Sequence, residues 1–522
     1  MERKWWTLIA VSVATFMLLL DITVVNVALP SIREDLGASF TDLQWVFDAY
    51  TLTLAALVLT AGSLADRLGR RRLFAAGSSI FTVASLLCAL APDPTFLNLA
   101  RALQGAGGAA MFAVSLALVA QEFPAGRERG TAMGIYGASI GAAVAIGPLV
   151  GGTLTDTLGW ESIFYLNVPV GLATIALTYL KLRESRDPNV TGVDWTGVAT
   201  FSAALFLLVF ALLRGNADGW GSTPIVSLFA GSAALLVAFL AVERRVDEPM
   251  LPLGLFRRPA FTGVQVAAFA VSGSMFALFL YLTLYLQNYL GLSPIETGVR
   301  YLPISLMAFF AAPIAGALLS RVQARVLLSI GLAAVGVGLL LMGGIDDGDE
   351  WTTLLGGFLV AGAGIGLINP VVADVAVSVV PKEQSGMAAG TNDTFRQVGI
   401  AMGIAVWGAI FVGRAADKVS ELAAGTAAAS GDHPRELAEA ASTGNLHQAL
   451  AAIPVEARET VSNAAREGFL TGLNDVLTLG AVVSIAGAVL ALWLVRERDI
   501  ERQWIGAESE RESPAPPERL ST

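Results

Sequence analysis

The stretch ATFMLLLDITVVNVALP, residues 14–30, is apolar almost throughout and carries one charge, Asp21. Similar apolar stretches recur along the chain, for example LTLAALVLTAGSL at 52–64 and AVVSIAGAVLALWLV at 481–495. Each belongs to a run close to the ~20 residues that a helix needs to cross a bilayer. The sequence therefore predicts a chain of membrane-spanning helices, for which lipid is the main solvent.

The composition excludes most soluble proteins. Of 522 residues, 55% are apolar and 15% are charged, whereas about 25% are charged in an ordinary globular chain. The net charge of −10 is spread over short loops and one hydrophilic segment, so it does not indicate a basic partner. We find no basic stripe or nucleic-acid-reading motif and expect no nucleic-acid partner. Cys88 is the only cysteine, which excludes an intramolecular disulfide.

We expect an all-α polytopic membrane protein with fourteen transmembrane helices. The expected spans are 6–30, 44–65, 73–91, 95–122, 130–155, 161–181, 193–214, 224–243, 261–288, 296–319, 326–344, 352–378, 388–412 and 472–495. The first run is longer than the apolar region of a signal peptide and has no small-residue cleavage pattern. It is expected to stay in the protein as the first helix.

Lysine and arginine predict the orientation. They gather in alternate connecting segments, above all in the run Arg70-Arg71-Arg72, whereas the segments 92–94, 156–160 and 345–350 contain none. Under the positive-inside rule the basic set is cytoplasmic. Both termini are then cytoplasmic, which requires an even number of spans. The abundance of Ala and Gly and the preference for Arg over Lys favour a bacterial plasma membrane.

Two hydrophilic segments remain. Segment 413–470 is predicted to be a long, partly helical external loop that holds both histidines, His433 and His447. We interpret these histidines as solvated side chains rather than metal ligands, and we expect no metal and no cofactor. The tail 496–522 is charged and ends in SPAPPERLST, a composition typical of disorder.

The chain repeats itself. Gly105 and Pro124 align with Gly362 and Pro381 at one constant offset, which also brings the first helix onto the ninth. We therefore expect two parallel six-helix halves, an architecture typical of transporters. The predicted domains are 1–192 for the N-terminal half, 193–243 for two inserted helices, 244–495 for the C-terminal half with its external loop, and 496–522 for the tail.

Asp21 and Arg101 are charged residues inside predicted spans, where charge is costly and usually functional. At 1.5 Å per residue they lie about 10–14 Å from the external ends of their helices. A carboxylate that is both desolvated and close to an arginine can load and release a proton. No predicted span contains a histidine, so Asp21 is the leading proton carrier. The alternative is a structural hydrogen bond.

The run Gly62-Ser-Leu-Ala-Asp66-Arg67-Leu-Gly69-Arg70-Arg71-Arg72 connects the second and third spans. Gly62 permits close helix packing, and Asp66 is suited to the N-terminus of a partner helix or to an arginine. We expect a latch between the halves. The second half keeps a weaker copy, in which Ser320 replaces the acid. A plain basic loop is the alternative.

The fifth helix contains Gly147, Pro148, Gly151 and Gly152. This density lowers helix propensity but permits bending and close backbone contact. Generic glycine-rich packing is the alternative interpretation.

Together these residues resemble the major facilitator superfamily, in its fourteen-helix drug:proton antiporter branch. The 62–72 run is similar to the superfamily's loop 2–3 signature, and Arg101-x2-Gln104 to the fourth-helix motif associated with proton transfer. The fifth helix resembles the exporter motif, although Ala143 stands where glycine is usual. The stretch from Asp21 to Pro30, and Asn167-Val-Pro-Val-Gly171, resemble first- and sixth-helix signatures. Glu161-Ser162 departs from the usual Arg-Trp. The resemblance implies gating by Gly62, Asp66, Arg67, Gly69, Arg70 and Arg71.

Further candidates lie mainly in the second half. Asp393 and Arg396 are expected close together, as a coupling pair or as a structural salt bridge, and Asp374 is a coupling candidate or an interfacial residue. A substrate cavity is predicted from Asn26, Phe276, Phe279, Tyr281 and Tyr285. These aromatic residues are otherwise lipid or packing contacts.

The predicted function is proton-coupled antiport that exports amphipathic small molecules. The expected partners are cargo, protons and the bilayer, and the expected state is a monomer. An uptake permease and an exporter of one dedicated natural product are the alternatives. A phosphate-loop ATPase is disfavoured because no lysine follows glycine. An enzyme is not expected, because we find no catalytic Ser/His/Asp set or metal-ligand cluster.

Overall fold

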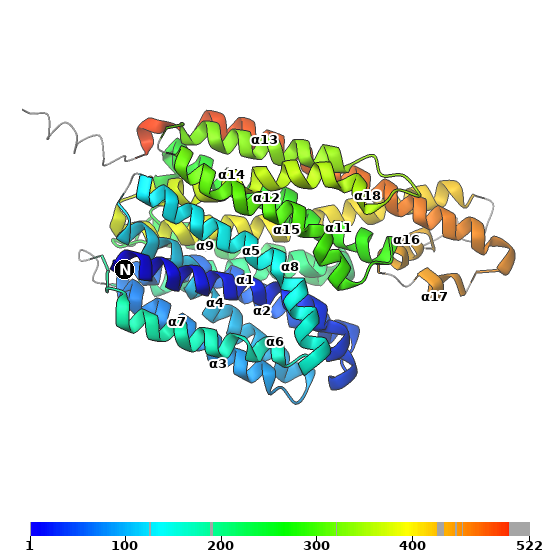
Figure 1. Ribbon diagram of the computed structural model, residues 1–522, viewed down its shortest axis with the longest axis horizontal. Coiled ribbons are helices and arrows are strands. Elements are labelled where there is room, and N and C mark those ends of the chain that lie inside the picture. Colours follow the sequence, from blue (N-terminus) through cyan, green and yellow to red (C-terminus); the bar gives the residue numbers. More distant parts are fainter. Residues whose placement is uncertain are drawn as a thin grey trace, which may run out of the picture.

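The protein is described by a computed structural model (Figure 1). The described residues are 2–124, 127–187, 192–319, 321–424, 433–443, 446–451 and 453–500. The side chains of a few further residues, among them Asn26, Pro148 and His447, also lie outside the described part. The predicted disorder of the tail falls mostly on residues outside this description.

Helices of membrane length account for almost all of the described chain. They are α1 (Arg3–Leu36), α2 (Phe40–Leu68), α3 (Arg70–Ala89), α4 (Pro94–Glu122), α5 (Arg127–Leu158), α6 and α7 (Ser162–Tyr165 and Asn167–Lys181), α8 (Trp195–Asp218), α9 (Thr223–Glu243), α10 to η3 (Pro259–Tyr289), α12 (Pro294–Leu318), α13 (Ala324–Met342), η4 and α14 (Trp351–Leu354 and Leu355–Ser378), α15 (Ser385–Leu422) and α18 (Val455–Leu494). Thirteen of these segments are apolar enough to span a membrane, and the glycine-rich α5 lies among them as the fourteenth. The all-helical expectation is confirmed.

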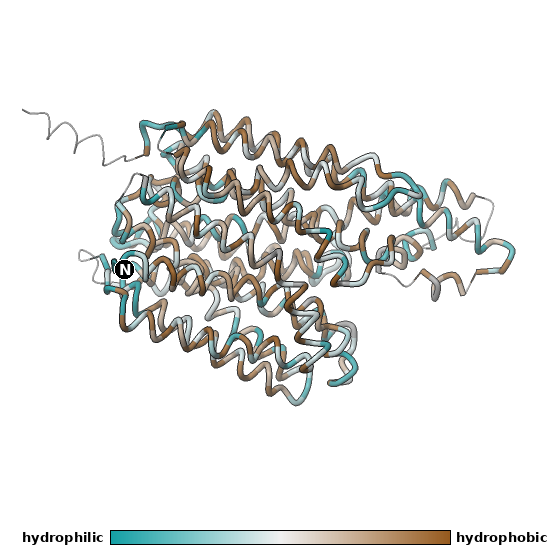
Figure 2. Tube along the Cα trace, viewed as in Figure 1, coloured by the Kyte–Doolittle hydropathy of each residue, from teal (hydrophilic) through white to brown (hydrophobic). Residues whose placement is uncertain are grey.

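The helices run side by side along the long axis of the molecule (Figure 1). Hydrophobic residues predominate along their central parts, and hydrophilic residues gather toward the ends of the bundle (Figure 2). Both the N-terminus and the last described helical turn lie at one end, which we call the terminal end. The other is called the opposite end.

The starts of several helices carry capping side chains. Ser39 and Asp42 form a capping box at the start of α2, and Asp93 accepts a hydrogen bond from the N–H of Phe96 at the start of α4. Such caps satisfy N–H groups that have no partner within the helix. They fix where these helices start.

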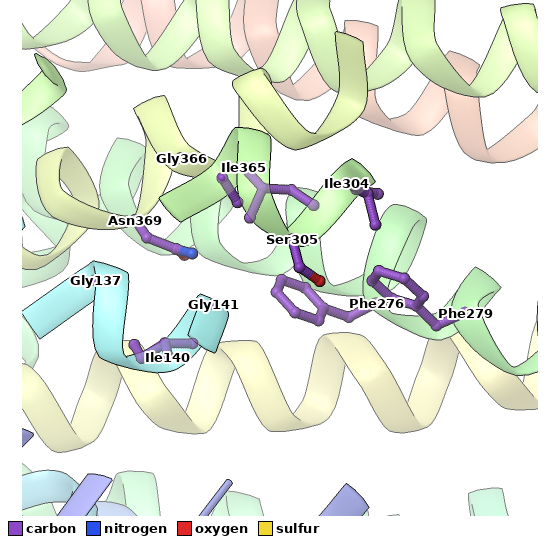
Figure 3. Close-up of a pocket in the computed structure, with 11 residues that line it drawn as sticks. Gly137, Ile140, Gly141, Phe276, Phe279, Ile304, Ser305, Ile365, Gly366 and Asn369 are labelled. Carbon is purple, nitrogen blue, oxygen red and sulfur yellow. The ribbon is translucent and has the colours of Figure 1, made fainter. Parts of the chain in front are cut away.

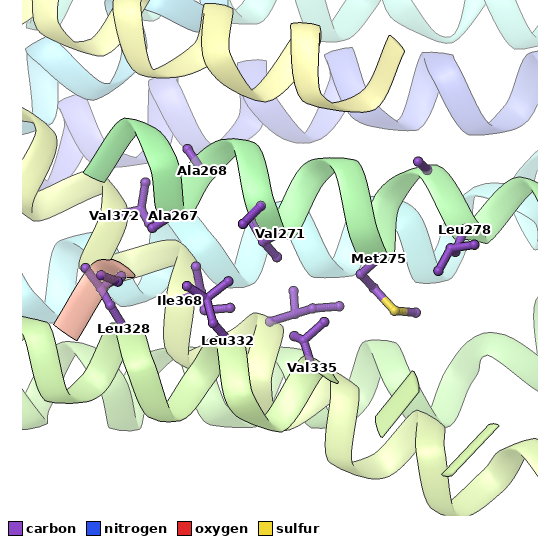
Figure 4. Packing of buried hydrophobic residues seen from close by; sticks show 14 of the residues in the cluster. Ala267, Ala268, Val271, Met275, Leu278, Leu328, Leu332, Val335, Ile368 and Val372 are labelled. Carbon is purple, nitrogen blue, oxygen red and sulfur yellow. The ribbon is translucent and has the colours of Figure 1, made fainter. Parts of the chain in front are cut away.

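Each half has its own apolar core. In the second half, α10, α13, α14 and α18 surround a fully buried cluster that includes Val271, Leu332 and Ile368 (Figure 4). Separate clusters fill the first half around α1 to α4. Between the halves, α5 packs along α12, and α2 packs along α15. These two helix pairs form the principal seams.

The inserted helices α8 and α9 form a hairpin, in which α8 touches both halves. Val209 and Leu212 on α8 share a small apolar cluster with Leu52 on α2 and Ala405 on α15. Asn216 donates a hydrogen bond to the carbonyl oxygen of Ala405 across 3.1 Å. The hairpin thus lies against the α2–α15 seam.

The ninth span is interrupted, where the sequence predicted one continuous helix. It consists of α10 (Pro259–Val271), the π-turn η2 (Ser272–Phe276), α11 (Ala277–Leu284) and the π-turn η3 (Tyr285–Tyr289). In η2 the carbonyl oxygen of Gly273 accepts a hydrogen bond from the indole of Trp407 across 2.7 Å. Hydropathy carries no signal for such a turn.

Much of the segment predicted as a partly helical external loop is helical. Helix α15 continues to Leu422, and α18 already begins at Val455. With α16 (His433–Thr443) and α17 (Leu446–Ala451) they enclose a small apolar core, which we call the cap. The apolar residues Val419, Leu437, Val461 and their neighbours explain the ordering.

The cap is attached to the second half by a polar cluster. Tyr289 donates a hydrogen bond to Asp347 across 2.6 Å, and Arg466 on α18 forms an ion pair with the same carboxylate at 3.2 Å. The Tyr289 hydroxyl, followed by Arg466, lowers the pKa of Asp347 below its usual value. His433 in the cap lies beside Glu436.

The beginning of the tail is ordered, contrary to the prediction. Residues 497–499 form a 3-10 turn, and Glu497 accepts a hydrogen bond from the backbone N–H of Ala324 across 2.6 Å. The acid therefore caps the start of α13, a favourable place for negative charge.

Candidate functional site

Asp21 is the acceptor at the centre of a buried polar network inside the first half. Arg101 donates to its Oδ2 across 2.5 Å, while Gln104 and Asn167 donate to its Oδ1 across 2.9 and 2.7 Å. The side chains of Asp21 and Arg101 have no solvent exposure. Opposite charges at similar depth in α1 and α4 are therefore in direct contact.

Arg101 is held from several sides. Its Nε donates to the carbonyl oxygen of Val46 on α2, and the ring of Tyr50 lies 4.4 Å below the guanidinium. Gln104 also accepts from Nη1 across 2.6 Å and donates to Ser85 on α3. The network therefore connects α1, α2, α3, α4 and α7.

Asn167 was not chosen as a site residue from the sequence. It begins α7 and is 1% exposed, which places its amide beside Asp21. The sequence offered one signal for a role of this residue, its place in the stretch Asn167-Val-Pro-Val-Gly171. The stretch reads as a helix start, and nothing in it indicates which side chain the amide meets.

Asp66 joins the two halves at the terminal end. Its oxygens accept from the backbone N–H groups of Gly386 and Met387 across 3.0 and 2.7 Å. Arg70 donates to the same carboxylate and also to the carbonyl oxygens of Lys382 and Glu383. Both contacts considered for Asp66, a helix N-terminus and an arginine, are present. We call this set of contacts the α2–α15 junction.

Glycine permits this junction. A Cβ on Gly62 would overlap the carbonyl oxygen of Gly386, so the two backbones meet without side chains. Gly69 has φ of 113°, a conformation that favours glycine. These two glycines set the close approach and the turn between α2 and α3.

The remaining basic residues of the run attach other connecting segments. Arg67 donates to the carbonyl oxygens of Gly192, Glu248 and Pro249 across 2.6–3.0 Å. Arg71 donates a long hydrogen bond, 3.4 Å, to the carbonyl oxygen of Leu182. Arg67 therefore connects α2 to both segments that flank the inserted hairpin.

The second half has a related contact with α5. A Cβ on Gly130 would overlap the carbonyl oxygen of Gly316 on α12. Nearby, Arg129 and Asp374 form an ion pair at 3.0 Å without a well-aligned hydrogen bond. Asp374 on α14 thus contacts Arg129 on α5. Ser320, the expected replacement for the acid, lies outside the described residues.

The glycines of α5 contact two neighbours. A Cβ on Gly147 would overlap Thr23, and one on Gly151 would lie 2.9 Å from the Cα of Val24, both on α1. A Cβ on Gly152 would lie 2.8 Å from Ile295 at the start of α12. This surface of α5 therefore packs against both halves. The side chain of Pro148 is outside the described part.

A pocket lies at the α5–α12 seam, between the two halves (Figure 3). It contains about 420 Å³ of space not filled by protein atoms, open solvent at its mouth included. Its lining is almost entirely apolar, with Ser305 and Asn369 as the polar side chains. The lining residues are Gly137, Ile140, Gly141, Phe276, Phe279, Ile304, Ser305, Ala308, Ile365, Gly366 and Asn369.

Two of the four predicted aromatic cavity residues, Phe276 and Phe279, line this pocket. Tyr281 and Tyr285 are not among its lining residues. Their hydroxyl groups donate instead to the carbonyl oxygens of Ile404 and Asp349 across 2.7 and 3.3 Å. Successive residues of one helix face different directions, so only one side of this span reaches the pocket. The predicted side chain of Asn26 lies outside the described part.

Arg396 connects to the pocket through Asn369. Its two terminal nitrogens donate to Oδ1 of Asn369 across 3.2 Å, and its guanidinium lies 5.8 Å from the Phe276 ring centre. Asp393 and Arg396 are close enough for their charges to interact, but no ion-pair contact joins them among the described residues. The amide of Asn369 supplies the acceptor in its place. Sequence reasoning missed Asn369, although an Asn-Pro pair inside an apolar span was a usable signal.

Comparisons with known proteins agree with this geometry. The model of the Major Facilitator Superfamily matches residues 11–404. The tetracenomycin C resistance and export protein of Streptomyces glaucescens is 34% identical over 96% of this chain and 93% of its own. The puromycin resistance protein pur8 of Streptomyces alboniger is 39% identical over 79% of this chain and 83% of its own.

Two further proteins are similar to this chain. The multidrug resistance protein Stp of Mycobacterium tuberculosis is 36% identical over 77% of this chain and 75% of its own. The crystal structure of the human organic anion transporter MFSD10 is 15% identical, covers 94% of this chain and 99% of its own, and has a TM-score of 0.62. That likeness concerns the fold alone. The chain belongs to the Major Facilitator Superfamily.

Proposed function

We propose that this transporter is a proton-coupled antiporter that exports amphipathic small molecules such as drugs, antibiotics and dyes. The relatives named for antibiotic or multidrug resistance support export, because they match this chain over most of its length. The single observation that carries the proton part is the buried Asp21–Arg101 pair with its amide donors.

Protonation of Asp21 removes the charge that holds Arg101. Arg101 then loses its anionic partner, while its Nε still donates to the carbonyl oxygen of Val46 on α2. The same helix carries Asp66, which contacts the start of α15. A change in the position of α2 is therefore a direct route from the proton site to the α2–α15 junction, and the proton favours one arrangement of the halves through differential binding.

In this proposal, segments 1–192 and 244–495 move as the two rocking halves, and the terminal end faces the cytoplasm. The α2–α15 junction and the Arg129–Asp374 pair close that end. Gly147, Gly151 and Gly152 let α5 slide against α1 and α12. The location is a bacterial plasma membrane, the unit is a monomer, and the protein is not an enzyme.

The pocket is the cargo site in this proposal. Phe276 and Phe279 offer aromatic surface, while Ser305 and the Arg396–Asn369 pair supply polar groups at its edge. Apolar walls with a few oriented polar groups are typical of small-molecule sites. Because Arg396 is bonded to Asn369, the polar edge is already oriented before cargo arrives.

Transport into everted membrane vesicles tests the function. With an acidic lumen, a fluorescent amphipathic dye should accumulate inside the vesicles and should leave when the proton gradient is collapsed. Accumulation that persists without a gradient would contradict antiport. Movement of dye out of the vesicles would instead favour an uptake permease. Vesicles that lack the protein provide the baseline.

A further inference from the structure

Two buried carboxylates meet where the inserted hairpin opens at the terminal end. Asp194 is the N-cap of α8 and Glu243 is the last residue of α9, and they are 7% and 6% exposed. Asp194 accepts a hydrogen bond at Oδ1 from the N–H of Gly197 across 2.7 Å. Glu243 accepts one at Oε2 from the N–H of Leu251 across 3.2 Å.

The second oxygens of the two carboxylates both lie beside Gly197. A Cβ on Gly197 would overlap Oδ2 of Asp194 and lie 3.0 Å from Oε1 of Glu243. Both oxygens are buried, and neither receives a hydrogen bond from any residue that the structure describes. Two acceptors therefore point into one small space next to a glycine that leaves room for them.

The surrounding charges do not neutralise this pair. The charge of Arg67 on α2 acts on Glu243, but the terminal nitrogens of Arg67 donate to the carbonyl oxygens of Gly192, Glu248 and Pro249. Glu248 adds a third carboxylate, which accepts from the N–H of Gly192 across 2.8 Å. Two adjacent, buried carboxylates cannot both stay ionised without a large cost.

We propose that Asp194 and Glu243 bind one proton between them and form a second proton site, separate from Asp21. The hydroxyl of the protonated carboxyl donates to the free oxygen of the other, which satisfies both unpaired atoms. Loss of this proton to solvent leaves two like charges side by side and pushes the ends of α8 and α9 apart.

Because of its position, the proton site affects the α2–α15 junction. Segment 244–252, which follows Glu243, is held to α2 by Arg67 and by Ser63, whose hydroxyl donates to the carbonyl oxygen of Met250 across 3.3 Å. Deprotonation loosens the segment that lies beside the α2–α15 junction. The assignment of this pH sensitivity to the cytoplasmic side rests on the proposed function, but proton binding itself does not.

Thermal unfolding of the purified full-length protein, measured as a function of pH, tests the proposal without any cargo. If the folded pair still holds at neutral pH a proton that the unfolded chain has already released, stability falls as the pH rises until the folded pair loses that proton. Glu243→Gln supplies a permanent N–H donor to Asp194, and Asp194→Asn supplies one to Glu243 while it keeps the acceptor for Gly197. Glu34→Gln, on the exposed surface of α1, is the matched control.

Between pH 6 and pH 8.5 we expect the wild type and Glu34→Gln to lose about 1–2 °C more in Tm than either pair variant. The infrared band of a protonated buried carboxyl group should also be weaker in Glu243→Gln than in Glu34→Gln. Equal pH slopes in all four proteins would overturn the proposal. If stability depends on the concentration of Na⁺ or K⁺ and not on pH, the pair binds a metal cation instead of a proton, and the proposal is also overturned. If the pH slopes are as expected but the transport assay fails, the proposed function is contradicted and the proton site is not.

Discussion

The backbone N–H of Met387 donates to Oδ2 of Asp66 across 2.7 Å, and this bond joins the second helix of one half to the thirteenth span in the other. The N–H of Gly386 reaches the other oxygen. A carboxylate at a helix N-terminus is favoured by the orphan N–H groups and by the helix dipole. The junction is thus an electrostatic contact between the two halves.

Replacing Asp66 by alanine should slow export while the protein still folds. The change removes the acceptor for two N–H groups and leaves the Arg70 guanidinium buried without its carboxylate, so the closed terminal end loses stability. We expect at least a roughly tenfold lower export rate, which corresponds to about 1.4 kcal/mol. Dye efflux normalised to the amount of monodisperse protein measures it. Asp156→Ala, at an exposed position of α5, is the matched control, and equal rates in the two variants would count against the junction.

Replacing Gly62 by alanine tests the same junction sterically. The new Cβ overlaps the carbonyl oxygen of Gly386, and overpacking of this kind costs about 1–3 kcal/mol. Gly356→Ala, at a helical glycine with open space, should instead leave stability equal or higher. Tm and efflux of the two variants are compared. A harmless Gly62→Ala would mean that the two backbones do not meet during the transport cycle.

Replacing Phe276 by alanine should weaken cargo binding. The ring lines the pocket and lies beside Arg396, so its loss removes apolar contact area worth about 1–3 kcal/mol. We expect a roughly tenfold or larger rise in the KM of efflux with little change in expression. Phe206→Ala, at an exposed position of α8, provides the comparison. The same KM in both variants would place the cargo elsewhere.

Acid should loosen the attachment of the cap. The pKa of Asp347 is lowered by Tyr289 and Arg466, so its contribution to stability is present above the ordinary carboxyl range and is lost as the pH falls through its lowered value. The side chain is largely exposed, and the effect is therefore small, below about 1 kcal/mol. Asp347→Asn should raise amide exchange in α16 at neutral pH relative to Asp346→Asn. Identical exchange in the two variants would contradict the role of this cluster.

The sequence predicts the membrane fold well because hydropathy acts over whole spans. Fourteen runs of the right length require fourteen helices, whatever the detailed packing. The constant offset between Gly105 and Gly362 indicates two related halves. Hydropathy does not predict how far α15 and α18 continue beyond their apolar parts, because their ends in the cap are held by packing around Val419 and Val461.

The sequence predicts the contact partners of individual side chains less well than it predicts the fold. Asp21 and Arg101 could be matched because buried charges need opposite charges at the same depth. Arg396 was assigned to Asp393 by sequence proximity, but the amide of Asn369 on another helix is its acceptor. Likewise, nothing in the run of basic residues predicts that Arg67 contacts the segments around the inserted hairpin. Such contacts depend on which helix faces meet, and hydropathy does not specify these faces.

The central claim is that Asp21 carries the exchanged proton, and cargo-induced proton release from everted vesicles tests it most directly. Wild type and Asp156→Asn, a surface control, should release protons from the acidic lumen when dye is added. Asp21→Asn should release none while it still binds dye, because the pocket lies at the α5–α12 seam and not at Asp21. Full proton release by Asp21→Asn would contradict the account.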